Sequence, residues 1–296
     1  MNESIGLIGI GLVGTALAEN LNTAGYTVIG YDIDPQKCRH LEKIGGKAVA
    51  SPLQVAEKVD HLFLSLMDTD IVRDVLEGEQ GVLLSSSPPD YIIDTSTGDP
   101  DDTVNIAVQL KTKGIYYLDS PISGSSQQIR KREGVVMVGG DPTAYSACKD
   151  LYRAVATDFA FVGPSGSGSK AKLVSNVILG LNRLVLAEGL VFAEKFEFEL
   201  EAFLGLLKKT PAYSCAMDVK GKKMIAGNFD PQSRIRQHFK DLAITLSYAE
   251  KLGQPLPLTR IHKDILQKAI DAGDGDLDNA AVINQIRRLG FAGKHK

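Results

Sequence analysis

The chain has 296 residues, of which 44% are hydrophobic and 23% charged, and its formal net charge is −3. A chain of this kind can bury a full core, in one large domain or two modest ones. The weak acidic balance argues against a nucleic-acid partner. The 3 cysteines are far apart and the 5 histidines lack ligand spacing, so we expect reduced thiols and no metal site.

An apolar stretch near the start, residues 5–21, has the hydropathy of a signal sequence. However, Glu3 stands where a positive n-region is expected, glycines interrupt the stretch, and Glu19 comes too early for a membrane span. We therefore expect a cytoplasmic protein that does not bind a membrane.

The first half of the chain alternates short apolar strands with helical patterns. The predicted strands are 5–8, 27–31, 61–66, 91–94, 115–118 and 135–138, and the predicted helices are 13–24, 35–44, 71–76, 103–113 and 142–155. Strands that recur with helices between them predict a parallel sheet with right-handed crossovers.

Strand patterns largely stop after a turn rich in glycine and serine at 163–168. Helices are predicted over 169–196, 200–209, 237–252 and 258–272. We predict an α/β protein in which a Rossmann domain with a doubly wound parallel sheet, residues 1–162, precedes an all-helical domain, residues 163–296. The helix over 169–196 has little polar face, which favours a homodimer or homotetramer built through the helical domain.

The motif Gly9-Ile10-Gly11-Leu12-Val13-Gly14 follows a predicted strand and opens a helix. In a dinucleotide site the first glycine allows a tight turn, the second lets the backbone approach the pyrophosphate, and the third lets helix and strand pack closely. The amides of Leu12 and Val13 then face the phosphates. The alternative, a glycine-rich turn without a ligand, fits this context poorly.

Asp32 ends the next predicted strand. An acid at this position accepts hydrogen bonds from the ribose hydroxyls of NAD and repels the 2′-phosphate of NADP, so NAD is the expected cofactor and NADP the less favoured one. The less favoured alternative is that Asp32 is a solvated acid in a loop.

Three further stretches carry chemistry. Residues 94–97 and 119–124 follow successive strands, where open α/β sheets place ligands. Lys172 and Asn176 are four residues apart, on one face of an otherwise apolar helix. Burial lowers the pKa of a lysine, which lets it exchange a proton with a substrate hydroxyl. Lys170 lies on another face and lacks a matching amide, and the plainer alternative for Lys172 is a lysine that extends from a buried helix to solvent.

Five segments in this order resemble the β-hydroxyacid dehydrogenases, the group of 3-hydroxyisobutyrate dehydrogenase and tartronate semialdehyde reductase. The segments are 9–14 with Asn20-Leu21, 94–97, 119–124 with Gly139-Gly140, 163–176, and Lys240-Asp241-Leu242. The resemblance covers nearly the whole chain and implies a dinucleotide domain followed by a helical one.

The resemblance also implies roles for individual residues. Lys172 is the implied general acid/base and Asn176 its helper. The other implied positions bind substrate at Ser123, Gly124, Lys240 and Asp241, and cofactor at Leu66, Met67, Thr97 and Lys240. The implied reaction is a reversible oxidation of a small β-hydroxy acid to its semialdehyde or keto acid, in which a hydride passes between substrate and nicotinamide.

The chain departs from the family pattern beside Ser123. Large polar residues fill 125–133, where the family is rich in glycine and alanine, and Met67 stands where proline is common. This departure weakens any transfer of substrate identity. Arg130, Lys131 and Arg132 form either a solvated charge cluster or a partner for a second acidic group of the substrate.

Two other functions compete with a hydroxy-acid dehydrogenase. A decarboxylating enzyme of the 6-phosphogluconate dehydrogenase type shares the architecture, but the chain is short for that group's long helical region. A non-catalytic NAD-binding or redox-sensing module needs no catalytic lysine, so the presence of Lys172 with Asn176 argues against it.

Overall fold

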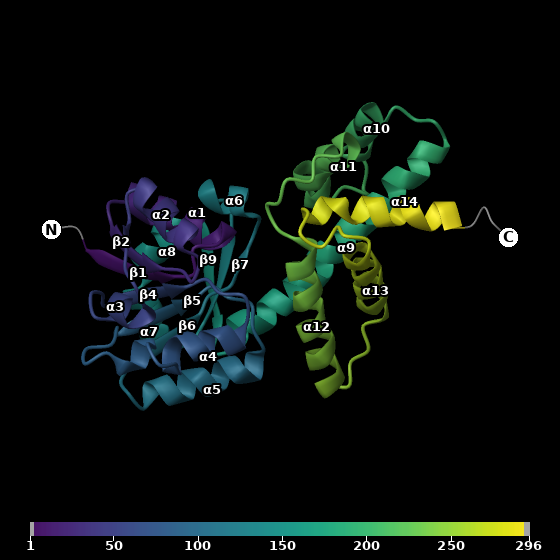
Figure 1. Cartoon of the computed structure of the whole chain (residues 1–296). Coiled ribbons are helices and arrows are strands. Elements are labelled where there is room, and N and C mark those ends of the chain that lie inside the picture. The colour runs from purple at the N-terminus through teal and green to yellow at the C-terminus, as the bar shows by residue number, and fades with distance from the viewer. Residues whose placement is uncertain (1–2, 293–296) are drawn as a thin grey trace. The chain divides into compact units, whose positions relative to one another are not determined.

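The computed structural model describes residues 3–292, and the chain divides into two compact units between Lys172 and Leu173. We call them the N-terminal unit and the C-terminal unit, and each is described by itself (Figure 1).

A nine-stranded sheet forms the centre of the N-terminal unit. Its order is β3-β2-β1-β4-β5-β6-β8-β7, with β9 also paired to β8. The strands are β1 Ser4–Ile8, β2 Thr27–Tyr31, β3 Lys47–Ala48, β4 His61–Leu64, β5 Tyr91–Asp94, β6 Tyr116–Asp119, β7 Ile122–Ser123, β8 Val135–Gly139 and β9 Asp158–Gly163. All pairings from β3 to β6 are parallel. The carboxyl ends of β1, β2, β4, β5 and β6 therefore point the same way.

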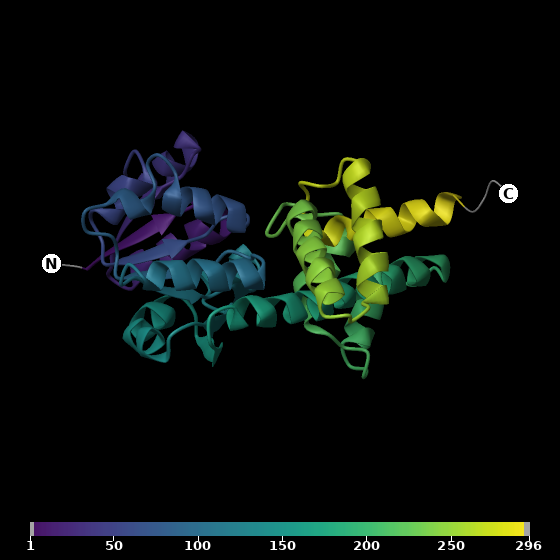
Figure 2. The same ribbon diagram turned by 90° about the horizontal axis from the view of Figure 1, so that it is seen from below.

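Helices cover both faces of this sheet (Figure 2). One apolar core joins the sheet to α1 Leu12–Thr23, α2 Pro35–Lys43, α6 Ser126–Arg130, α7 Pro142–Ala147 and α8 Lys149–Val155. The other core joins it to α3 Pro52–Ala56, α4 Thr69–Glu77 and α5 Pro100–Lys111. Local sequence starts several of these helices, because an Asp N-cap followed by proline at the first turn opens α2, α5 and α7.

The sheet is mostly parallel, as the alternating pattern predicts, but not entirely so. β8 runs antiparallel to both β6 and β7. Three strands were not predicted: β3 and β7, which are each two residues long, and β9, whose residues are mostly exposed at a sheet edge. The single helix predicted over 142–155 is two helices that meet at Cys148. No glycine or proline marks this break, and Cys148 is buried in the core there, so tertiary packing sets it.

Helices make up the C-terminal unit. The long helix α9 Ser167–Lys195 runs on from the N-terminal unit, and α10 Leu200–Leu207, α11 Lys222–Ala226, α12 Ile235–Lys251, α13 Pro257–Asp271 and α14 Val282–Ala292 follow it. A π-helical turn over Met217–Gly221 precedes α11. One apolar cluster joins these elements, and α12 and α13 lie side by side (Figure 2).

α9 is long and apolar enough to cross a membrane by length and composition alone, with a mean hydropathy of 1.5 in its most apolar window. Half of that window is buried inside the fold. Leu184, Ala187 and Leu190 belong to the core of the C-terminal unit, so this part of α9 packs inside the fold.

Candidate active site

The glycine turn after β1 leaves space where a dinucleotide would need it. Gly9 has a φ of +93°, and a Cβ there would come 2.3 Å from the carbonyl oxygen of Ser65. A Cβ on Gly14 would lie 1.9 Å from the carbonyl oxygen of Gly9, so α1 packs directly on its own strand. At Gly11, by contrast, a Cβ would meet nothing within 4 Å.

The N-terminus of α1 begins at this open position. Gly11 is the N-cap, no side chain caps the helix, and its first turn carries no acidic residue. The amides of Leu12 and Val13 are therefore available to an anion, which the helix dipole also favours. These residues fit the pyrophosphate of a nicotinamide dinucleotide.

Asp32 lies directly after β2, with most of its side chain buried. One carboxylate oxygen accepts the amide of Ile10 at 2.7 Å, and the other accepts the amide of Asp34 at 2.9 Å. The Lys37 ammonium lies 3.4 Å away. Asp32 therefore ties the second strand to the glycine turn. Its neighbour Ile33 is 86% exposed and carries no charge for a 2′-phosphate.

The other predicted cofactor residues lie at the same edge of the sheet. Leu66 and Met67 follow β4, and Thr97 follows β5. The Leu66 amide donates to the Ser96 hydroxyl at 2.9 Å, which links the two loops. Met67 is exposed and Thr97 half-buried.

Lys172 is held beside the predicted carboxylate anchor within the N-terminal unit. Its side chain is largely buried, and its Nζ donates to the carbonyl oxygen of Ile122 at 2.7 Å. Ser123 and Gly124 follow in the chain, and Ser123 is fixed by pairing of β7 with β8. This bond rules out the alternative in which Lys172 extends to solvent.

Asn176, Lys240 and Asp241 form a second group within the C-terminal unit. Asn176 on α9 donates from Nδ2 to a carboxylate oxygen of Asp241 on α12 at 3.1 Å. The other oxygen of Asp241 lies 3.1 Å from Nζ of Lys240. Asn176 and Asp241 are buried. Asp241 thus orients the amide and the ammonium together.

Asp119 is a functional candidate that the sequence analysis did not assign. It ends β6 and is 2% exposed, and its carboxylate accepts the amides of Gly166 and Ser169 at the start of α9. Burial raises its pKa to about 6, although the two amide bonds lower it. The signal in the sequence was an acid that directly precedes Ser120-Pro121, one strand after Asp94.

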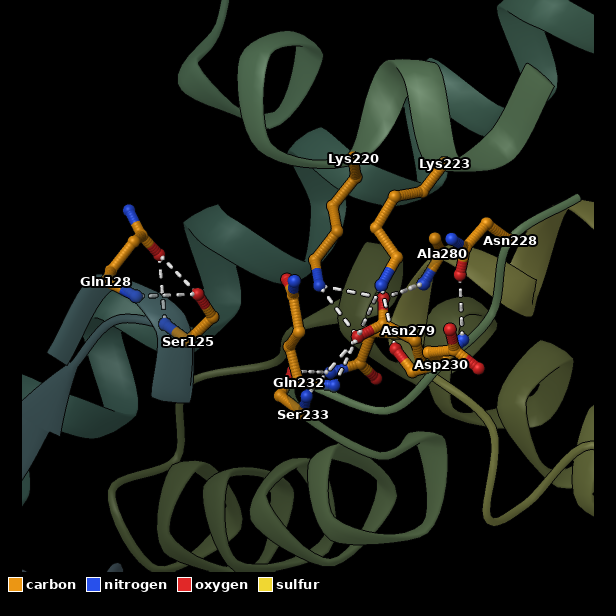
Figure 3. A network of polar contacts seen from close by, with 11 residues as sticks. Ser125, Gln128, Lys220, Lys223, Asn228, Asp230, Gln232, Ser233, Asn279 and Ala280 are labelled. Atoms are coloured by element: carbon orange, nitrogen blue, oxygen red, sulfur yellow. Dashed lines mark hydrogen bonds and ion pairs between the residues drawn. The ribbon is translucent and has the colours of Figure 1, made fainter. Parts of the chain in front are cut away.

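The polar segment after Gly124 closes its own hydrogen bonds. Ser125 caps the short helix α6, and its amide donates to the side chain of Gln128 at 2.9 Å while Gln128 donates its amide to the Ser125 hydroxyl at 3.3 Å (Figure 3). Arg130 pairs with Glu19 of α1 at 2.7 Å, and Arg132 donates to the Arg153 carbonyl. These contacts support the solvated-cluster interpretation of the basic run.

A buried charged network in the C-terminal unit lies outside the predicted site. Asp278 is fully buried, and both its oxygens accept from Lys220, at 2.7 and 2.9 Å (Figure 3). It also accepts the amides of Gln232 and Ala280. Burial opposes the charge of Asp278, but Lys220 and these amides outweigh it and hold its pKa below the usual value. This network fixes the segment that leads into α12.

No group of histidine, cysteine and acidic side chains arranged to hold a metal ion occurs within residues 3–292.

Comparison with known proteins agrees with this architecture. A family model described as the NAD binding domain of 6-phosphogluconate dehydrogenase matches residues 4–163. A second, described as NAD-binding of NADP-dependent 3-hydroxyisobutyrate dehydrogenase, matches residues 166–286. The crystal structure of 3-hydroxyisobutyrate dehydrogenase from Salmonella typhimurium superposes with a TM-score of 0.86 at 27% identity, over 96% of this chain and 99% of that one.

Two relatives show how the chain relates to whole proteins. It is 32% identical over 287 residues to 2-hydroxy-3-oxopropionate reductase of Escherichia coli (strain K12), covering 96% of this chain and 97% of that protein. It is 28% identical over 286 residues to cytokine-like nuclear factor N-PAC of Drosophila melanogaster, covering 96% of this chain and 48% of that protein. The chain therefore spans about half the length of N-PAC.

The fold and the glycine turn define a dehydrogenase-type protein with a nicotinamide-dinucleotide domain and a helical second domain. The chain belongs to the β-hydroxyacid dehydrogenase family.

Proposed function

We propose that the chain is an NAD-dependent oxidoreductase of small β-hydroxy acids and their semialdehydes, with Lys172 as the general acid/base. The observation that carries this proposal is the position of Lys172 Nζ, 2.7 Å from the carbonyl oxygen of Ile122 and beside Ser123 and Gly124. An ammonium or amine held next to residues that bind the substrate carboxylate is placed to exchange a proton with the substrate oxygen. The E. coli relative, named 2-hydroxy-3-oxopropionate reductase, supports this substrate class.

In the proposed mechanism the residues of this chain bind, orient and move a proton. Ser123 and Gly124 hold the substrate carboxylate, and neutral Lys172 takes the hydroxyl proton as the carbinol becomes a carbonyl. In the reverse direction the Lys172 ammonium protonates the carbonyl oxygen. Asn176, whose amide is oriented by Asp241, is the helper that the family resemblance implies for Lys172. When bound, the dinucleotide accepts or supplies the hydride.

Turnover tests the role of Lys172. We expect Lys172→Ala to lower kcat/KM at least about 100-fold on a panel of hydroxy acids and semialdehydes, because a positioned general acid/base contributes this much. Lys170→Ala, an exposed lysine two residues away on the same helix, is the matched control and keeps wild-type turnover. Wild-type activity in Lys172→Ala refutes the mechanism. Stabilisation of the wild type by NAD with no turnover across the panel favours a binding module, and CO2 release from 6-phosphogluconate favours a decarboxylating enzyme.

We propose NAD rather than NADP, supported by buried Asp32 and uncharged, exposed Ile33 at the end of β2. A 2′-phosphate beside Asp32 meets a negative charge. NAD is expected to raise the melting temperature more than NADP at equal concentration. Stronger stabilisation by NADP contradicts this assignment.

We also propose a cytoplasmic homodimer or homotetramer assembled through the C-terminal unit. Val185 and Phe192 on α9 and Phe196 directly after it are each more than half exposed, a large apolar surface for a soluble protein. Glu188 and Lys195 lie seven residues apart on the same side, so an antiparallel second copy of α9 pairs each with the other. Phe192→Ser is expected to lower the mass measured by light scattering, and an unchanged mass refutes this interface.

A further inference from the structure

The start of α9 is fixed by the carboxylate of Asp119. One oxygen accepts the amide of Gly166 and the other the amide of Ser169, both at 2.9 Å. A negative charge at a helix N-terminus is favoured by the free amides and by the helix dipole. Because both oxygens are used, the carboxylate sets both the position and the direction of the first turn of α9.

No side chain separates this turn from the strands beneath it. A Cβ on Gly168 would lie 2.4 Å from the carbonyl oxygen of Asp119 and 2.5 Å from that of Met137. A Cβ on Gly139 would lie 2.6 Å from a carboxylate oxygen of Asp119. α9 therefore begins in direct backbone contact with the ends of β6 and β8, where small shifts are resisted.

The segment that holds the helix also holds the lysine. Lys172 comes three residues after Ser169, and its Nζ donates to Ile122, three residues after Asp119. We propose that Asp119 is a positioning residue for proton transfer: its carboxylate anchors the first turn of α9 and so keeps the ammonium of Lys172 beside Ser123 and Gly124. This inference rests on the function proposed for Lys172.

The surroundings of Asp119 make this anchor sensitive to pH. The titratable groups that face it are Asp94 from β5, Tyr117 from β6 and Tyr152 from α8, while β8 and the first turn of α9 present glycine backbone. Burial, with a smaller contribution from Asp94, raises the pKa of Asp119 to about 6. Below that pH the carboxyl group loses its charge, and the oxygen that carries the proton becomes a donor and a weaker acceptor for its amide.

Protonation of Asp119 weakens its hold on the start of α9 but stabilises the folded state. The folded pKa of about 6 lies above the ordinary 3.8, so between these values the folded state binds the proton more tightly and gains stability as the pH falls. Loss of the anchor near pH 5 is therefore expected without unfolding caused by this group.

The first experiment uses no substrate. Asp119→Asn is compared with Asp141→Asn, which removes a carboxylate that also accepts two amides at a helix start, that of α7, but is only partly buried. We expect hydrogen exchange of the amides over 166–172 to rise at least tenfold, and reductive methylation of Lys172 to accelerate, in Asp119→Asn alone. In the wild type the same protection, corrected for intrinsic exchange, is expected to fall between pH 7 and 5 at constant circular dichroism. Unchanged hydrogen exchange together with unchanged labelling of Lys172 in Asp119→Asn overturns the proposal. If that variant does not fold, the same two measurements in the wild-type pH series decide in the same way.

The second experiment follows reduction of tartronate semialdehyde, the direction in which Lys172 must be protonated, so that its own titration lowers the rate only at high pH. Wild-type kcat/KM is expected to fall below about pH 6. Asp119→Asn is expected to start 10- to 100-fold lower at pH 8 and to lack that fall. An acid limb that persists in Asp119→Asn overturns the proposal. A wild type inactive on every semialdehyde, with exchange and labelling as expected, refutes the proposed function and leaves the anchoring of Lys172 supported.

Discussion

The glycines of the dinucleotide turn allow a paired test in which neighbouring glycines respond in opposite ways. Gly11 has a φ of −78° and a ψ of −159°, a conformation that alanine adopts without strain, and its Cβ would enter open space. We expect Gly11→Ala to change the free energy of unfolding by less than about 0.5 kcal/mol. The added methyl group occupies the approach of the pyrophosphate, so dinucleotide affinity is expected to fall at least about tenfold, or about 1.4 kcal/mol.

Gly14→Ala, in contrast, is expected to destabilise the free protein. Inside a helix this change normally stabilises by about 0.5–1 kcal/mol. Here the Cβ would lie 1.9 Å from the carbonyl oxygen of Gly9, which is backbone and cannot rotate away. Overpacking of this kind costs about 1–3 kcal/mol, so the overlap outweighs the gain in helix propensity. The melting temperature of the free protein is expected to fall, by about 2–4 °C for each kcal/mol lost.

Differential scanning fluorimetry of the free protein measures the change in stability, and titration with NADH fluorescence measures the change in dinucleotide affinity. The expected pattern is a stable Gly11→Ala that binds weakly and a destabilised Gly14→Ala. Wild-type NADH affinity in Gly11→Ala refutes the placement of the pyrophosphate at α1. A raised melting temperature in Gly14→Ala refutes the close packing of α1 on β1.

Three other predictions concern buried and exposed charge. Asp278→Asn leaves Lys220 buried without a counter-charge, so urea unfolding is expected to show a loss of about 3–5 kcal/mol, and a loss below about 1 kcal/mol contradicts the role of this network. Burial and the charge of Arg183 lower the pKa of His262 from 6.5 to about 3, so stability is full above pH 6.5 and falls in acid, by about 2 kcal/mol at pH 5. His262→Leu is expected to remove that part of the pH dependence, and the same slope in the variant refutes it. Replacing Arg130 and Arg132 together with glutamine is expected to leave kcat/KM for a dicarboxylic semialdehyde unchanged, because Arg130 already pairs with Glu19, and a tenfold loss assigns them to the substrate.

Most of the dinucleotide half of the fold could be predicted because its signals are local. Strands such as Thr27–Tyr31 and Tyr91–Asp94 are short apolar runs, and the glycine spacing follows from the backbone approach it must allow. The antiparallel direction of β8 carries no comparable signal in the sequence, since it depends on pairing with β6 and β7.

The candidate site divides in the same way. Spacing on a helix was enough to single out Lys172 and Asn176. The partners of these residues were not readable, because the carbonyl of Ile122 and the carboxylate of Asp241 lie 50 and 65 residues away in sequence. The role of Asp119 could not be predicted for the same reason, because its two amide donors are 47 and 50 residues away in sequence.

The short helix α6, which follows the proposed substrate anchor Ser123 and Gly124, has a consequence for how such a site can be altered. α6 satisfies its first amides through Ser125 and Gln128, and Asn20 of α1 holds its far end by donating to Ile129 at 2.7 Å. A segment that meets its own hydrogen-bonding needs can be replaced as a cassette without disturbing the strands on either side. Such a replacement changes the surroundings of the proposed substrate anchor while Lys172 and the glycine turn stay fixed.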